Sequence, residues 1–144
     1  MKNLIPFVAI VFLALLFTQC KSDDDNAECI CTEEFSPVCG DDGVLYGNSC
    51  FAECEGVTYT VGYCPETADG LVRDLGDPAV DGCGWVLEIP INNEVVTVRP
   101  NVLDDLFQVD SLAVRVDFKQ TFDTSVCGLG GFIPVVEVLG MEQL

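Results

Sequence analysis

The sequence of 144 residues contains no histidine and only six lysine and arginine residues, against 24 aspartate and glutamate residues. With a formal net charge of −18, the chain has no basic surface of the kind that binds nucleic acid, so we expect no DNA or RNA partner. The absence of histidine removes the usual general base of hydrolytic enzymes and the commonest metal ligand. We therefore do not expect the protein to be an enzyme, and we expect no catalytic residues, no metal site and no cofactor.

The N-terminus predicts export. Lys2 precedes an apolar run over residues 4–17, which has the length of the hydrophobic region of a signal peptide and is short for a membrane span. Residues 1–19 are therefore interpreted as a signal peptide. The signal peptide ends in Phe17-Thr18-Gln19, which Cys20 follows, and this segment resembles the lipobox of bacterial lipoproteins. Phe17 stands where lipoboxes usually have leucine, and Gln19 where they usually have a small residue.

The lipobox resemblance implies a lipid on Cys20 and a linker over residues 20–28. The segment Lys21–Asp25 is similar to the acidic export tag of surface lipoproteins. The expected location is therefore the bacterial cell envelope, with the protein attached to the outer-membrane surface through its lipid. An uncleaved N-terminal anchor followed by a flexible acidic linker is the alternative.

Nine cysteines are many for a chain of this length, and their distribution is uneven. Cys20 stands alone, six cysteines lie within residues 29–64, and Cys83 and Cys127 remain. Lipidation of Cys20 would leave an even number for pairing. Without histidine, and in an oxidising compartment, the other cysteines predict disulfides rather than a zinc site.

Residues 29–64 are too few to bury a core that offsets chain entropy, so this unit is expected to depend on its disulfides. Cys50 and Cys54 are spaced as i and i+4, which places both on one face of a short helix. Asn48 or Ser49 is expected to cap that helix at its N-terminus.

Turn and strand signals surround this helix. Gly56 is expected to end it, because glycine favours the left-handed conformation that follows many helices. Asp41-Asp42-Gly43 predicts a turn, followed by a short strand over residues 44–46. Residues 58–61 have the β-branched and aromatic content of another strand.

The segment Pro37–Cys50, with all six cysteines in register, resembles the signature of the Kazal-type serine protease inhibitors. The single residue between Cys29 and Cys31, and the sequence over residues 48–57, are most similar to the short-spaced members that resemble the leech tryptase inhibitor. The resemblance implies a small disulfide-rich α+β domain over residues 29–64. It also implies three pairs, which spacing alone leaves open: Cys29–Cys54, Cys31–Cys50 and Cys39–Cys64.

In this family, the segment after the second cysteine is a loop that enters a protease active site as a substrate would. The resemblance assigns the protease-binding loop to Cys31, Thr32, Glu33, Glu34 and Phe35. Glu33 becomes the P1 residue, whose side chain enters the specificity pocket, and the bond to Glu34 becomes the scissile bond. Asn48 matches the family asparagine whose amide donates hydrogen bonds to loop carbonyls.

A glutamate at P1 favours a glutamyl endopeptidase, because an ionised carboxylate is costly to bury in an apolar or acidic specificity pocket. The implied function is a secreted or surface-anchored serine protease inhibitor, a monomer that acts on an extracellular serine protease. The alternative is a non-inhibitory cell-surface binding or structural lipoprotein, in which the β domain that follows carries recognition.

Residues 65–69 predict a linker, and residues 70–144 predict an all-β domain whose function the sequence does not reveal. Alternation of apolar and polar residues is clearest over residues 112–118. The five expected strands cover residues 71–75, 83–89, 95–99, 112–118 and 132–139. They predict an antiparallel five-stranded barrel or sandwich, with an OB-like fold among the alternatives.

Three further features of this half carry expectations. Cys83 and Cys127 are expected to form a disulfide. Asn92-Asn93 predicts a hairpin turn between the second and third strands, and residues 101–108 a helical or loop crossover. Trp85 is expected to pack in the core rather than to bind a ligand.

Overall fold

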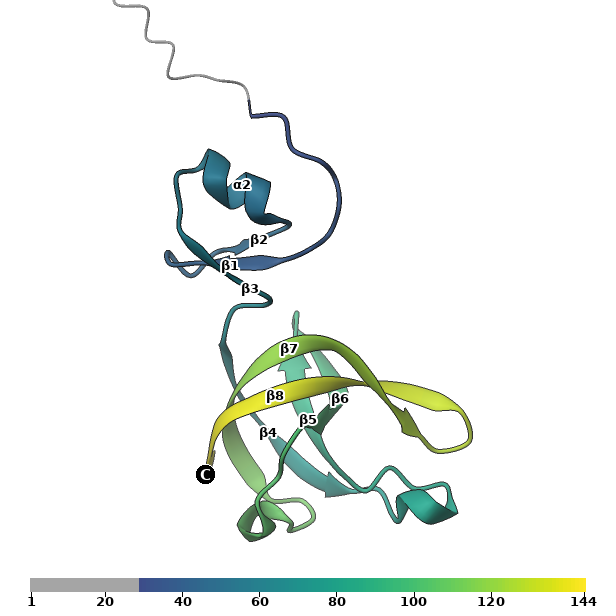
Figure 1. Cartoon of the computed structure of the whole chain (residues 1–144). Helices are drawn as coiled ribbons and strands as arrows, with labels where there is room; N and C mark the ends of the chain where they lie inside the picture. The colour runs from purple at the N-terminus through teal and green to yellow at the C-terminus, as the bar shows by residue number, and fades with distance from the viewer. Residues whose placement is uncertain (1–28) are drawn as a thin grey trace, which may run out of the picture. The chain divides into compact units, whose positions relative to one another are not determined.

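The computed structural model describes residues 29–144 (Figure 1). The predicted signal peptide, the predicted lipid site at Cys20 and the linker over residues 20–28 lie outside the described residues. Within residues 29–144, no helix is long and apolar enough to span a membrane. These residues fold as a small disulfide-linked α+β domain followed by an all-β domain.

The first domain contains a three-stranded antiparallel sheet. Its strands β1 (Val38–Gly40), β2 (Leu45–Tyr46) and β3 (Tyr59–Val61) lie in the order β2-β1-β3. β2 and β3 fall within the predicted segments, whereas β1 is too short to show an alternating pattern. The predicted turn joins β1 to β2, and Gly43 adopts a φ of +80°, which glycine tolerates without strain.

The helix α2 (Ser49–Cys54) contacts all three strands of this sheet. Asn48 is the N-cap, because its side chain accepts hydrogen bonds from the backbone N–H groups of Cys50 and Phe51. Ala52 is fully buried, and its small side chain allows close packing of the helix. Gly56 follows the last turn with a φ of +70°, in agreement with its predicted role.

Disulfides connect the helix, the sheet and the chain that precedes them. The structure contains the pairs Cys31–Cys50 and Cys39–Cys64, which the family resemblance implies. Cys29 and Cys54 are each disulfide-bonded as well, and their pairing with one another stays a prediction. Because these cross-links restrict the unfolded chain, a domain with very few buried residues can be stable.

The second domain is a closed five-stranded barrel, which decides between the barrel and the sandwich. Its strands lie in the order β4-β5-β6-β8-β7, and β4 pairs with β7 to close it. The strands are β4 (Glu66–Asp74), β5 (Trp85–Ile91), β6 (Glu94–Pro100), β7 (Ala113–Cys127) and β8 (Gly131–Gln143). Because β8 lies between β6 and β7, the strands have a Greek-key arrangement of the OB type, in line with the predicted OB-like alternative.

One strand pair corrects the expectation of a wholly antiparallel barrel. β6 and β8 are parallel, with Arg99 opposite Val135 and Pro100 opposite Val136. The connection between β6 and β7 carries the chain across the end of the barrel, so β8 returns beside β6 in the same direction. This connection contains a single 3-10 turn, Asp105–Phe107, within the predicted crossover.

The barrel core follows the alternation that the sequence shows. Val114, Val116 and Phe118 on β7 are fully buried, whereas Arg115 and Asp117 between them are exposed. These side chains pack with residues from the other four strands: Val72, Leu87, Ile89, Ile91, Val98 and Val136. Trp85 is partly buried against this cluster, as expected of a core residue.

The largest differences from the predicted strand boundaries are at the start of β4 and the end of β7. β4 begins at Glu66, within the predicted linker, because residues 66–70 pair with residues 114–118 of β7 despite their polar composition. β7 continues to Cys127, because its polar second half pairs with the start of β8 as a hairpin that projects from the barrel (Figure 1). The predicted disulfide Cys83–Cys127 attaches this hairpin to the segment before β5.

The hairpin between β5 and β6 has the predicted turn. Asn92 and Asn93 both adopt positive φ values, 51° and 66°, and Ile91 lies opposite Glu94. Two consecutive left-handed residues match the right-handed twist of the flanking strands, and asparagine tolerates this conformation better than most residues.

Candidate functional site

The predicted protease-binding loop is an exposed segment held at both ends. It leaves Cys31, which is bonded to Cys50 on α2, and reaches β1, where Cys39 is bonded to Cys64. Thr32 to Ser36 are all exposed and form no helix or strand, whereas the following residues, 37–40, are buried. The loop is thus exposed to solvent while the two disulfides hold its ends.

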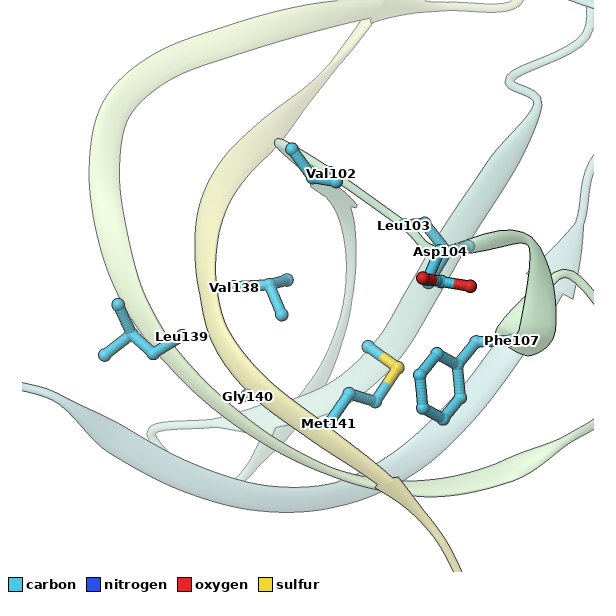
Figure 2. Close-up of a pocket in the computed structure, with 8 residues that line it drawn as sticks. All are labelled: Val102, Leu103, Asp104, Phe107, Val138, Leu139, Gly140 and Met141. Carbon is cyan, nitrogen blue, oxygen red and sulfur yellow. The ribbon is translucent and has the colours of Figure 1, made fainter.

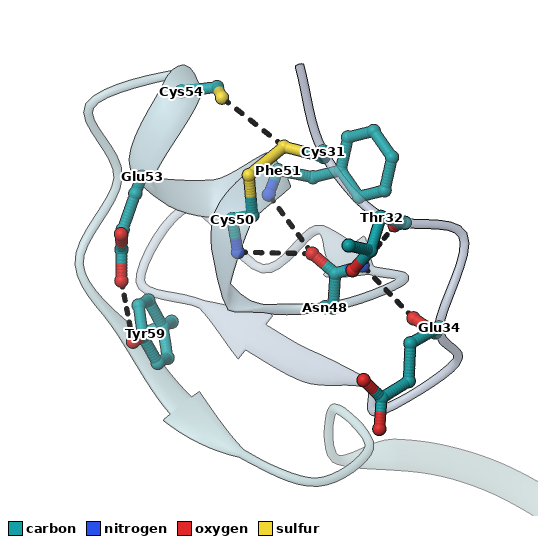
Figure 3. The surroundings of a disulfide bond; sticks show 9 residues. All are labelled: Cys31, Thr32, Glu34, Asn48, Cys50, Phe51, Glu53, Cys54 and Tyr59. Atoms are coloured by element: carbon teal, nitrogen blue, oxygen red, sulfur yellow. Dashed lines mark hydrogen bonds between the residues drawn. A yellow bond between two sulfur atoms is a disulfide. The ribbon is translucent and has the colours of Figure 1, made fainter. Parts of the chain in front are cut away.

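Asn48 connects this loop to the helix (Figure 3). Its side-chain Nδ2 donates hydrogen bonds to the carbonyl oxygens of Thr32 (2.8 Å) and Glu34 (2.9 Å). Its Oδ1 accepts from the backbone N–H groups of Cys50 (3.0 Å) and Phe51 (3.4 Å). An amide uses both of its hydrogens and its oxygen here, which no other side chain of this size can do.

Asn48 is 7% exposed, and it is the single buried polar residue among residues 29–144. Because the Asn48 side chain is buried, losing these hydrogen bonds would leave its polar atoms unsatisfied. A further backbone hydrogen bond, from Ser36 N to Gly47 O (2.9 Å), attaches the loop just before β1. Sequence reasoning did not include Ser36 and Gly47, since backbone hydrogen bonds leave no signal in side-chain identity.

Glu33 lies between the two carbonyls that Asn48 holds. The peptide group before Glu33 and the peptide group after Glu34 are therefore held, while Glu33 itself is exposed to solvent. Phe35, the other large side chain of the loop, is 62% exposed. The loop thus presents accessible side chains on a restrained backbone.

The charge around this loop has one sign. Residues 29–64 contain six acidic residues and no lysine or arginine: Glu33, Glu34, Asp41, Asp42, Glu53 and Glu55. Hydrogen bonds from the Val44 backbone N–H (3.0 Å) and then the Tyr46 hydroxyl (2.8 Å) lower the pKa of Asp42 below its ordinary value. The domain therefore carries a negative surface at neutral pH.

Comparison with known proteins identifies this domain. The family "Kazal-type serine protease inhibitor domain" matches residues 20–64. The chain carries a Kazal domain. The family match ends at residue 64, before the barrel begins, so it describes the first part of the chain.

One curated relative supports the same assignment. Bdellin B-3 from Hirudo medicinalis is 52% identical over 33 residues, which cover 23% of this chain and 59% of that protein. The chain thus spans less than two thirds of the length of this relative. No solved structure matches the chain.

The barrel has a groove that sequence reasoning missed (Figure 2). Its volume is about 200 Å³, and it lies between β8 and the connection that follows β6. The lining residues are mainly apolar: Val102, Leu103, Asp104, Phe107, Val138, Leu139, Gly140 and Met141. The two lining segments are more than 30 residues apart in sequence, and only the parallel return of β8 brings them together.

Proposed function

We propose that this protein is a serine protease inhibitor that acts through the loop after Cys31, with Glu33 as its P1 residue. The observation that carries the proposal is the pair of hydrogen bonds from Asn48 to the carbonyls of Thr32 and Glu34. They hold the backbone on both sides of Glu33 while the side chain stays accessible.

Restraint of the loop explains why a protease would be inhibited by this protein rather than cleave it as a substrate. A loop that is ordered before binding loses little conformational entropy in the complex, so more of the contact energy appears as affinity. If a protease cuts the bond between Glu33 and Glu34, the hydrogen bonds of Asn48 and the disulfides hold both new ends in place. The two ends can then rejoin more readily than they separate.

The target that the chemistry favours is a glutamyl endopeptidase. The P1 side chain is desolvated in the specificity pocket, and a carboxylate needs a cationic or hydrogen-bonding partner there. Trypsin-like pockets are acidic and repel it, while elastase-like and chymotrypsin-like pockets are apolar. The acidic surface of the domain would further favour an enzyme with a basic rim around its active site.

The test is a titration of a serine protease panel with the oxidised protein, alongside a Glu33→Leu variant. The panel contains a glutamyl endopeptidase, trypsin, chymotrypsin and elastase. We expect stoichiometric inhibition of the glutamyl endopeptidase by the wild-type protein. The leucine variant should lose this inhibition and gain inhibition of chymotrypsin or elastase, because only the P1 side chain has changed.

Two results would count against the proposal. If neither protein inhibits any enzyme of the panel although its disulfides are formed, the loop is not inhibitory. If both inhibit the same enzyme equally, Glu33 does not occupy the specificity pocket.

The second candidate is a non-inhibitory binding or structural lipoprotein in which the barrel carries recognition. The apolar groove between residues 102–107 and 138–141 favours it, because partly exposed apolar surface of this kind often contacts ligands. Rapid net cleavage after Glu33 with loss of the first domain would support this candidate, whereas resistance to cleavage would support inhibition.

The location that we propose is the outer surface of a bacterial cell envelope, with a lipid on Cys20. The support is the sequence of the N-terminus alone. Metabolic labelling with a radioactive fatty acid should mark the wild-type protein but not a Cys20→Ser variant. Equal labelling of both proteins, or of neither, would contradict lipidation at Cys20.

A further inference from the structure

Phe35 is the largest exposed apolar side chain of the loop, and it has an aromatic neighbour within its own domain. Its ring lies 6.5 Å from the ring of Tyr63, centroid to centroid, in an edge-to-face arrangement at 61°. Edge-to-face pairs are attractive beyond the area that they bury, because the positive edge of one ring faces the negative face of the other.

Tyr63 is well restrained on its own segment. It stands directly before Cys64, which is bonded to Cys39, and directly after Gly62, whose N–H donates to Pro37 O (2.8 Å). Gly62 has a φ of +103°, a conformation that redirects the chain after β3. The Tyr63 ring has a second aromatic neighbour, Phe122, at 5.4 Å.

We propose that Tyr63 is a positioning residue for Phe35, and that the pair directs the loop toward proteases with an apolar subsite beyond the scissile bond. This inference rests on the proposed function, because it assigns Phe35 as the second residue after the bond between Glu33 and Glu34. A phenylalanine that is 62% exposed would otherwise lose rotamer freedom when a protease binds it. The contact with Tyr63 restricts that freedom beforehand.

The first test measures inhibition with single and double variants. Tyr63→Ala should weaken inhibition about fivefold, mainly through faster dissociation, while Tyr63→Phe keeps the ring and should bind as the wild type does. In a Phe35→Ala background, Tyr63→Ala should have no further effect. Phe122→Ala is the matched control and should leave the coupling between Tyr63 and Phe35 unchanged.

The second test uses the free protein, so that the two proposals can fail separately. Nuclear Overhauser effects between the rings of Phe35 and Tyr63 should be present in the wild-type protein and in the Phe122→Ala variant. Absence of these effects overturns the positioning role, whether or not the protein inhibits. If the effects are present but no protease is inhibited, the proposed function fails, and with it the assigned subsite preference.

Two inhibition results would overturn the inference while leaving the proposed function intact. The first is an inhibition constant of Tyr63→Ala equal to that of the wild type, and the second is an equal loss from Tyr63→Ala with and without Phe35. In either case Tyr63 would contribute only to the fold of the domain.

Discussion

Asn48 donates a hydrogen bond from its side-chain amide to the carbonyl oxygen of Glu34, a residue 14 positions earlier in the chain. The same nitrogen donates to Thr32, and the amide oxygen caps α2. One side chain therefore links the order of the loop to the start of the helix.

These two roles of Asn48 can be separated. Asn48→Asp keeps an oxygen that can cap α2 but replaces the donating nitrogen with an acceptor that faces two carbonyl oxygens. Losing two hydrogen bonds of about 1 kcal/mol each should weaken inhibition about 30-fold and speed cleavage after Glu33. Inhibition constants and cleavage rates measure this, and circular dichroism checks that the helix persists. An unchanged inhibition constant would show that the loop does not need this support.

Exchange of the P1 residue should redirect the loop. In Glu33→Lys, the new ammonium group can pair with the acidic pocket of trypsin-like enzymes, whereas the native carboxylate is repelled. We expect trypsin inhibition to rise on the order of 100-fold or more over the wild-type protein. A Glu34→Lys variant is the matched control, since it adds the same charge one residue later. Equal gains in both variants would indicate a general charge effect rather than pocket recognition.

The disulfide Cys83–Cys127 should stabilise the barrel. It closes a loop with a sequence separation of 44, and removing a cross-link of this kind typically costs about 2–4 kcal/mol. Replacing both cysteines by alanine should lower the urea midpoint of the barrel by a corresponding amount. Trp85 is the single tryptophan of the chain and lies on β5, so its fluorescence reports on the barrel. An unchanged midpoint would mean that strand pairing alone holds the projecting hairpin.

Stability of the Kazal domain should depend on pH through Asp42. Its pKa is lowered in the folded state, so its ionised form stabilises the fold above the unfolded pKa of about 3.9, and this contribution is lost as pH falls through the folded value. Asp42→Asn should therefore lower the melting temperature at pH 7 and approach the wild type in acid.

Tyrosine fluorescence is a suitable signal for this comparison, because all three tyrosines, Tyr46, Tyr59 and Tyr63, lie in the first domain. A Glu55→Gln variant, which removes the same charge from another residue of this domain, serves as the control. A difference between wild type and Asp42→Asn that stays constant from pH 7 to pH 2 would contradict the role of the carboxylate.

Local patterns predicted the elements whose formation is itself local. The spacing of Cys50 and Cys54 and the polar residues before them located α2, and Asn92-Asn93 located a hairpin turn. The alternation from Leu112 to Phe118 predicted the core face of β7 because each inward residue is apolar.

Features that depend on long-range pairing could not be read in this way. Residues 66–70 have the composition of a linker, and they form a strand only because β7 provides a partner for their backbone. The parallel contact of β6 with β8 and the barrel groove arise from the path of the whole chain.

In the candidate site too, local features could be predicted from the sequence and long-range contacts could not. The resemblance located Asn48 and the loop, because side-chain chemistry is specific there. The contact between Phe35 and Tyr63 joins residues far apart in sequence and has no spacing signal. Likewise, the hydrogen bond between Ser36 and Gly47 involves backbone atoms that every residue possesses.

The short contact between β6 and β8 has a consequence for the motions of the barrel. Two residue pairs are in register there, and Asn101 adds hydrogen bonds to Val136 and from Val138, whereas β7 and β8 pair along most of their length. Few interstrand hydrogen bonds must break for this seam to part, so we expect transient opening to begin there and to cost less free energy than global unfolding. Such an opening exposes Val136 and one end of the core to water while the other four strand contacts persist. The β6–β8 seam is therefore the part of the barrel that we expect to open first.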